Sequence, residues 1–212
     1  MKSILLTYKT FILYFIVILF HSVGIVGLST SAYHDYFLSL SFFNLLLSFI
    51  VLLLGRQHHS IKFYSFVLTC ALYGMLVEWI GVHTHLLFGH YSYGENLGLK
   101  FYEVPLIIGI NWCVLTISTS SIASFISKNV ILHLLISCSL MVGIDLLIEP
   151  VAIKSDYWSW ENQNIPTYNY ICWFFVSIPI HLLYLKMKLS EQNKVSVCLF
   201  IVLVIFFLIL NI

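Results

Sequence analysis

The strongest constraint in this sequence is a series of long apolar runs separated by short polar connections. Of the 212 residues, 60% are apolar and 9% are charged, whereas a water-soluble domain carries about 25% charged residues. Several runs are long enough to cross a hydrocarbon core of roughly 30 Å as helices, and β-barrel strands would be shorter and would alternate. The sequence therefore predicts an all-α, polytopic integral membrane protein, with residues 1–212 in a single transmembrane domain.

Seven of the apolar runs are predicted to be transmembrane helices. They cover Thr10–Leu28, Tyr36–Leu54, Phe63–Leu87, Phe101–Ile126, Val130–Ile153, Tyr168–Met187 and Val195–Leu210. The first run could instead be a signal peptide, with Thr30-Ser31-Ala32 as a poor cleavage site, but its length favours a retained first span.

The Lys and Arg residues predict the orientation of these spans. Eight lie on one side: Lys2, Lys9, Arg56, Lys62, Lys128, Lys186, Lys188 and Lys194. The other side holds Lys100 and Lys154. The positive-inside rule then places the N-terminus in the cytoplasm and the C-terminus outside, and we expect the cell (inner) membrane. The net charge of +1, with its basic residues scattered, excludes a polybasic nucleic-acid binder.

The two long connections predicted to face the outside resemble each other. In each, an acid is followed thirteen and fifteen residues later by aromatic residues: Glu78 by Tyr91 and Tyr93, and Asp145 by Trp158 and Trp160. Each then continues with a proline, a nearby Asn and a Trp seven residues beyond the proline: Pro105, Asn111 and Trp112, then Pro166, Asn169 and Trp173. This predicts a parallel internal repeat of spans 3–4 and 5–6, over approximately residues 63–126 and 130–187.

The predicted repeat places one carboxyl per unit inside the bilayer. Glu78 and Asp145 are expected roughly 13 to 15 Å below the loops that follow them, and Glu149 lies one turn above Asp145 on the same helix face. An ionisable group at that depth is costly and is a functional-site candidate. Burial and like-charge neighbours favour the neutral form, which is a proton donor. The alternative is that these acids only tie helices together through hydrogen bonds.

The nine histidines raise the question of a metal centre. Membrane di-iron oxygenases need several His boxes that converge from one side of the bilayer. His83 and His85 are two residues apart, so they face different ways, and they lie across the membrane from His58 and His59. We therefore predict no metal site and no cofactor. His85 shares a predicted helix face with Glu78 and is a candidate to orient it or relay protons to it, or is a structural histidine.

Carboxylic acids ringed by aromatic residues in lipid suit a hydrocarbon substrate. Protonation of a trisubstituted alkene gives a tertiary carbocation, which aromatic faces and a carboxylate stabilise. Attack by water gives a tertiary alcohol, whereas a dry site closes a ring. The candidate catalytic residues are Asp145 as proton donor, Glu78 as the partner that shares its proton or activates water, and Glu149 as outer relay. The candidate substrate-binding residues are Trp158, Trp160, Trp112, Trp173, Tyr91, Tyr93, Asn111, Asn169 and His85.

Over Tyr73–Trp173 the chain resembles a known family. The pattern is E-x2-G, F-G-x-Y-x-Y and V-P, then D-x3-E-P, W-x-W, I-P, N and W, beginning at Glu78 and ending at Trp173. It is similar to the carotenoid biosynthesis membrane proteins that include gamma-carotene hydratases and bisanhydrobacterioruberin hydratase. Departures from the family pattern are Asn164-Ile165 and Cys172, where glycines are expected, and Glu149-Pro150 in place of Asp-Pro. They bear on substrate choice more than on reaction type.

The resemblance implies a carotenoid hydratase, a lyase that adds water across the terminal double bond of an acyclic carotenoid end group without a redox cofactor. Its partners would be the lipid-soluble carotenoid, membrane lipids and other carotenoid-biosynthesis enzymes. Two alternatives stay open. The same fold would serve a carotenoid or isoprenoid cyclase or isomerase, and the carboxyls would also suit a membrane transporter or a non-catalytic scaffold.

Overall fold

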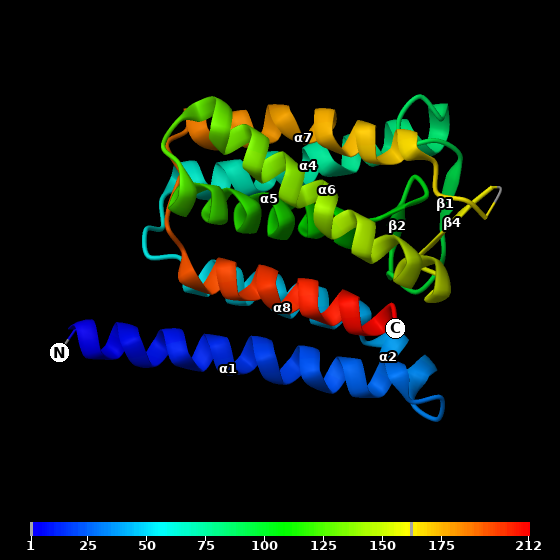
Figure 1. The fold of residues 1–212 in the computed structure, drawn as a ribbon, viewed down its shortest axis with the longest axis horizontal. Helices are drawn as coiled ribbons and strands as arrows, with labels where there is room; N and C mark the ends of the chain where they lie inside the picture. Colours follow the sequence, from blue (N-terminus) through cyan, green and yellow to red (C-terminus); the bar gives the residue numbers. More distant parts are fainter. Residues whose placement is uncertain (1, 162) are drawn as a thin grey trace.

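The computed structural model describes residues 2–161 and 163–212, which form a bundle of helices with a few very short strands (Figure 1). The helices are α1 (Lys2–Ser29), α2 (His34–Ser39), α3 (Ser41–Gly55), α4 (Ile61–Thr84), α5 (Leu106–Ile126), α6 (Val130–Lys154), α7 (Thr167–Lys186) and α8 (Lys194–Leu210). The strands are β1 (Tyr91–Tyr93), β2 (Lys100–Phe101), β3 (Val104–Pro105) and β4 (Trp158–Trp160). The predicted all-α, polytopic membrane class is confirmed.

The described helices differ in length from the seven predicted spans. Five are long and apolar enough to cross a membrane: Thr7–Ser29 of α1, and α4, α5, α6 and α7. Helices α3 and α8 are apolar but have only 15 and 17 residues. The predicted span Tyr36–Leu54 is divided at Leu40 into α2 and α3. The span predicted from Phe101 begins instead at Leu106, because the extended Val104–Pro105 pairs with β2 and proline disfavours a helical residue before it.

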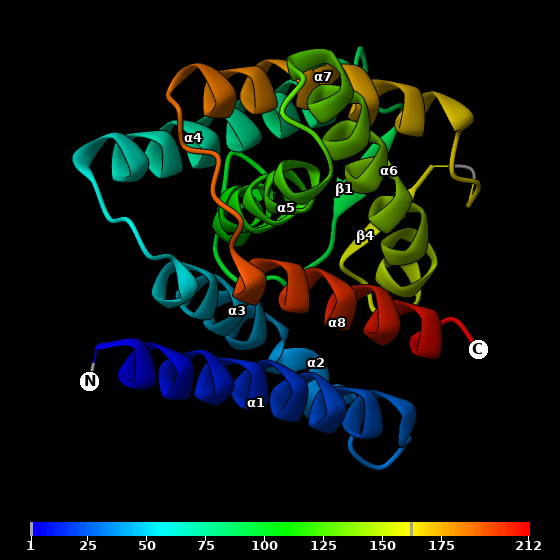
Figure 2. The same cartoon turned by 60° about the vertical axis from the view of Figure 1, so that its left-hand side comes forward.

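Helix α5 is the central element of the bundle (Figure 2). It packs against α3, α4, α6, α7 and α8. In its most apolar stretch 78% of the residues are buried, against 22% in the corresponding stretch of α1. Its buried face includes small hydroxyl residues from Thr116 to Ser121. Small residues let helix backbones approach closely in a membrane, where no hydrophobic effect drives helices together. Helix α1 packs on α8, α2 and α3, at the edge of the bundle.

The α4–α5 and α6–α7 connections meet in a two-stranded antiparallel ribbon of β1 and β4, which we call the aromatic ribbon (Figure 1). Its register pairs Tyr91 with Trp160, Ser92 with Ser159 and Tyr93 with Trp158. The pairing is symmetric about the central serines, whose hydroxyl oxygens are 3.3 Å apart. The two aromatic motifs that the sequence matched to each other are therefore direct neighbours in space, while the internal repeat of whole spans stays a prediction.

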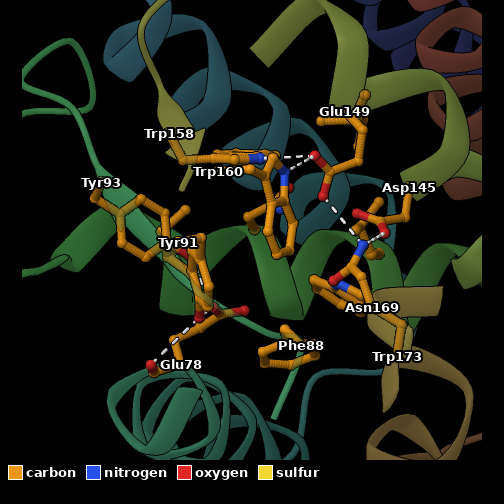
Figure 3. A pocket seen from close by; sticks show the side chains of 14 residues that line it. Glu78, Phe88, Tyr91, Tyr93, Asp145, Glu149, Trp158, Trp160, Asn169 and Trp173 are labelled. Atoms are coloured by element: carbon orange, nitrogen blue, oxygen red, sulfur yellow. Dashed lines mark hydrogen bonds between the residues drawn. The ribbon is translucent and has the colours of Figure 1, made fainter. Parts of the chain in front are cut away.

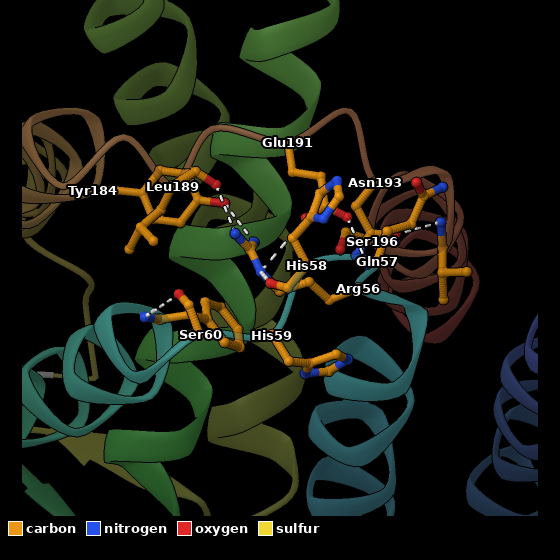
Figure 4. Close-up of polar contacts among 12 residues, drawn as sticks. Arg56, Gln57, His58, His59, Ser60, Tyr184, Leu189, Glu191, Asn193 and Ser196 are labelled. Carbon is orange, nitrogen blue, oxygen red and sulfur yellow. Dashed lines mark hydrogen bonds and ion pairs between the residues drawn. The ribbon is translucent and has the colours of Figure 1, made fainter.

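At the end of the bundle away from the aromatic ribbon, a buried arginine links the connection after α3 to α7 and to the connection after α7 (Figure 4). Arg56 follows α3 and is 6% exposed. Its guanidinium donates to the Tyr184 hydroxyl (3.3 Å) and to the carbonyls of Leu189 (3.0 Å) and His58 (2.8 Å), and Nε is 3.5 Å from Glu191 Oε2. The Glu191 side chain is only 12% exposed, because the connection after α7 brings it into contact with Arg56.

Candidate functional site

Glu78 is a carboxyl held by three hydrogen-bond donors in the interior of the bundle. It lies on α4 and is 3% exposed. Its Oε2 accepts from the Tyr91 hydroxyl (2.6 Å) and the Tyr93 hydroxyl (2.8 Å), while Oε1 accepts from Trp112 Nε1 (3.2 Å) on α5. The aromatic ribbon therefore does not lie above the acid as a separate interfacial belt, because both tyrosines of β1 reach down to it.

Two glycines on α4 make room for these donors. Gly74 and Gly81 lie one turn before and one turn after Glu78, on the same helix face. A Cβ at Gly74 would collide with the Trp112 ring, and a Cβ at Gly81 would lie 2.6 Å from the Tyr91 hydroxyl. The face of α4 is thus shaped so that an indole and a phenol can approach the carboxyl. Gly81 is part of the sequence motif, whereas Gly74 was not recognised.

Asp145 and Glu149 lie one turn apart on α6, and an amide lies between them (Figure 3). Asn169 Nδ2 donates to Asp145 Oδ2 (3.1 Å) and to Glu149 Oε1 (3.1 Å). Glu149 Oε2 also accepts from the indole N–H groups of Trp158 and Trp160, both at 2.9 Å. Glu149 therefore has three donors, whereas Asn169 is the side-chain donor to Asp145 within the described part of the chain.

The predicted register between the two motifs needs a correction. The sequence matched Glu78 with Asp145, but the acid that binds the tryptophan pair is Glu149. Glu78 lies six residues before Thr84, the last residue of α4, and Glu149 lies five residues before Lys154, the last residue of α6. The connection from helix to strand is shorter after α6 than after α4, and this difference shifts the sequence spacing by about one helical turn.

The tyrosines of the aromatic ribbon are fixed as donors. Burial, with the nearby Glu78 carboxylate, raises the pKa of the Tyr91 phenol well above its ordinary value, and the same two causes raise the pKa of Tyr93. Tyr91 also packs against Trp160 with ring centroids 5.3 Å apart. Both phenols therefore keep their protons at neutral pH and donate them in hydrogen bonds.

One small cavity, which we call the acid cavity, joins the two sets of groups (Figure 3). Its wall is formed by Glu78, Phe88, Tyr91, Tyr93, Ile108, Asn111, Leu115, Asp145, Ile148, Glu149, Trp158, Trp160, Asn169 and Trp173. The space open to the centre of a water molecule is about 30 Å³, which is room for about two waters. Three carboxyls, three indoles, two phenols and two amides thus surround a space for water.

The structure brings most of the predicted site residues to this cavity. Trp112 lies just behind the wall, where it stacks on Trp173 with ring centroids 4.8 Å apart and binds Glu78. His85 is not brought to the site: it ends α4 with a left-handed backbone (φ 56°), is exposed, and stacks on His90 at 4.0 Å. The helix ends at Thr84, so the face that His85 was expected to share with Glu78 does not continue to it.

Four wall residues of the acid cavity were not predicted. Ile108 and Leu115 come from α5 and Ile148 from α6, where apolar residues carry no signal that separates a cavity wall from ordinary packing. Phe88 is part of the motif that supports the resemblance, and its positive φ of 67° would not have been foreseen from its residue type. Its ring lies 5.6 Å from that of Trp173. Among the described residues, no three His, Cys, Asp or Glu side chains are grouped to hold a metal ion.

The fold and the cavity define an integral membrane protein of helices with buried carboxyls at an aromatic-lined site. Residues 36–212 match the model of the family described as carotenoid biosynthesis protein, and the chain belongs to that family. Its role is therefore in carotenoid biosynthesis. Comparison with curated proteins gave no match, and comparison with solved structures gave none.

Proposed function

We propose that this protein is a carotenoid hydratase that adds water across the terminal double bond of an acyclic carotenoid end group. The observation that carries the proposal is the acid cavity, in which Glu78, Asp145 and Glu149 line a space for about two waters beside indole and phenol rings. Hydration needs an acid, a water and a surface that stabilises a carbocation. The family supports a place in carotenoid biosynthesis, and the cavity supports this particular reaction.

In this proposal the proton comes from Asp145. Glu78 and Glu149 each accept three hydrogen bonds, an arrangement that satisfies an ionised carboxylate, whereas Asp145 accepts one from Asn169. The neutral acid protonates the CH carbon of the terminal double bond, and positive charge develops on the dimethyl-substituted carbon. The carboxylates and aromatic faces then stabilise a tertiary cation.

Water completes the proposed reaction. A water in the acid cavity forms the new C–O bond at the cationic carbon and releases one proton to a carboxylate. Asn169 contacts both Asp145 and Glu149, so the proton returns to Asp145 within a short distance. The sum is alkene plus water to tertiary alcohol, with no change in oxidation state and no cofactor consumed.

The test is expression in a host that accumulates lycopene or gamma-carotene, followed by chromatography and mass spectrometry of the pigments. We expect products heavier by one water, with the oxygen label taken from ¹⁸O-water. Asp145→Asn should lower this product by about 100-fold or more, whereas Asp35→Asn, at a fully exposed acid, should match the unmodified chain. A new product of unchanged mass would instead indicate cyclisation, and label from O₂ would indicate an oxygenase. No new pigment would favour transport or scaffolding.

We also propose that the N-terminus is cytoplasmic and the aromatic ribbon lies on the outer side of the cell membrane. The eight-to-two distribution of Lys and Arg supports this orientation. Reporter domains fused after Ile212 check it, because a reporter that is active only outside the cytoplasm should be active there. Activity of a cytoplasmic reporter at the same position would reverse the orientation.

A further inference from the structure

A second and much larger cavity, which we call the apolar chamber, adjoins the acid cavity. The space in it that is open to the centre of a water molecule is about 550 Å³. Residues of α1, α2, α3, α5, α6 and α8 form most of its wall. Five residues line both cavities: Ile108, Asn111, Leu115, Ile148 and Trp158. The two spaces therefore meet along these shared side chains.

The two cavities differ in what they can hold. The acid cavity, at about 30 Å³, has room for water but not for a branched hydrocarbon end. The apolar chamber lies within the size range of small-molecule sites, and most of its lining is aliphatic or aromatic. An alkene at the shared wall would therefore have its hydrocarbon part in the chamber and the acids and water on the other side.

The apolar chamber reaches the outside of the bundle beside α1. Four of its lining residues are exposed hydrophobics: Phe20 and Val23 on α1, Tyr36 on α2 and Phe43 on α3. In a membrane such apolar side chains face lipid rather than water. The rim is thus an apolar opening toward the bilayer, and α1, which precedes the family-matched residues, forms one side of it.

We infer that the apolar chamber is the binding site for the end of a linear polyene hydrocarbon, which enters sideways from the bilayer between α1 and the α2–α3 segment. The reaction at this site rests on the proposed function, whereas the binding site and its entrance can be tested without it. Substrate then arrives from lipid through the chamber, and water is held in the acid cavity. The terminal double bond meets the carboxyls at the wall formed by Ile108, Asn111 and Trp158.

The test uses a matched pair of substitutions on the lipid-facing side of α1. Val23→Trp places a large ring at the rim of the apolar chamber, whereas Val26→Trp makes the same change at a residue that is 66% exposed and does not line it. A third variant, Ser48→Leu, fills space inside the chamber, because Ser48 lines it from α3 and is 2% exposed. All three substitutions add apolar bulk and no charge.

The readout is lycopene bound per protein after reconstitution of the full chain in bilayer nanodiscs, measured by absorbance and by polyene quenching of tryptophan fluorescence. We expect Val23→Trp and Ser48→Leu to bind about tenfold more weakly. Val26→Trp should bind as the unmodified chain does. Equal binding by Val23→Trp and Val26→Trp, or no lycopene bound at all, would overturn the inference, and so would displacement of lycopene by membrane phospholipid alone.

This design separates the inference from the proposed function. If lycopene binds and Val23→Trp blocks it while no hydrated product forms in any sample, the chamber stands and the hydratase proposal fails. If hydrated product forms equally with Val23→Trp and Val26→Trp, the hydratase proposal stands and the lateral entrance fails.

Discussion

Tyr93 and Trp158 face each other across the aromatic ribbon with ring centroids 6.0 Å apart, yet they donate hydrogen bonds to different carboxyls. Tyr93 binds Glu78 of α4, and Trp158 binds Glu149 of α6. A single pair of strands thus holds acids from two helices, since β1 carries donors to Glu78 and β4 carries donors to Glu149. The ribbon is therefore the element that sets the geometry of the acid cavity.

Removing one donor should weaken the site without removing the fold. Tyr93→Phe leaves Glu78 with Tyr91 and Trp112, and loses one hydrogen bond to a buried carboxylate. We expect a stability loss of about 1.5–3 kcal/mol, since hydrogen bonds to charged groups have that strength. Product formation should fall by about tenfold. Thermal unfolding and pigment analysis measure the two effects, and Tyr33→Phe, at an exposed tyrosine, is the control. Unchanged values for both would contradict the role of Tyr93.

Asp145 should be the most sensitive of the three acids. Asp145→Asn keeps size and hydrogen bonding but cannot donate a carboxylic proton, so product should fall by about 100-fold or more. Asp145→Glu restores the acid one methylene further out and should recover part of the rate. Glu149→Gln, which retains an acceptor for the two indoles, should lose less than Asp145→Asn. A larger loss in Glu149→Gln would transfer the donor role to Glu149.

The glycines beside Glu78 give a steric test. Gly81→Ala and Gly74→Ala should displace Tyr91 and Trp112 and lower product formation by about tenfold, even though alanine favours helix by about 1 kcal/mol over glycine. Gly143→Ala on α6 is the control, because a Cβ there meets no atom within 4 Å. The three variants are compared by their rates of pigment conversion in membranes, normalised to protein level. Equal activity in all three would mean that the donors tolerate displacement.

The buried arginine should matter for stability rather than chemistry. Arg56→Gln leaves the largely buried Glu191 without its ion pair and removes the cation from the Phe63 ring, whose centroid is 4.1 Å away. Breaking a buried pair typically costs about 3–5 kcal/mol. We expect earlier thermal unfolding, while the folded fraction converts substrate at the normal rate. Lys62→Gln, at an exposed cation nearby, should unfold as the unmodified chain does. A lost turnover rate in folded Arg56→Gln would place this cluster in the reaction.

The register of the aromatic ribbon can be tested by a disulfide. Ser92 and Ser159 are directly paired, and Cβ atoms of such pairs lie about 4.5–5.5 Å apart, close to the separation that a disulfide spans. Ser92→Cys with Ser159→Cys should oxidise readily, and the product should survive denaturation as a cross-link between peptides of the two connections. Each single variant should give none. Failure of the double variant to cross-link would disprove this pairing.

The sequence predicted the parts of this molecule that depend on local composition. Apolar length identified the five helices that are long enough to cross a membrane, and acids inside apolar runs pointed to Glu78, Asp145 and Glu149, which line the acid cavity. The pairing of β1 with β4 joins residues 67 positions apart, as in Ser92 with Ser159, and nothing local to either strand specifies it. The burial of Glu191 likewise depends on Arg56, which comes from a distant connection. Nor does sequence spacing show that Glu149, rather than Asp145, binds the tryptophans.

The apolar chamber leads to one acid cavity, and this sets how a molecule with two identical ends is treated. If the proposed reaction holds, each visit modifies one end, and the pigment must leave the protein and turn round before the other end can be reached. Processing is then distributive rather than processive. The half-modified pigment becomes a free species in the bilayer, open to capture by any other enzyme that acts on it before its second visit.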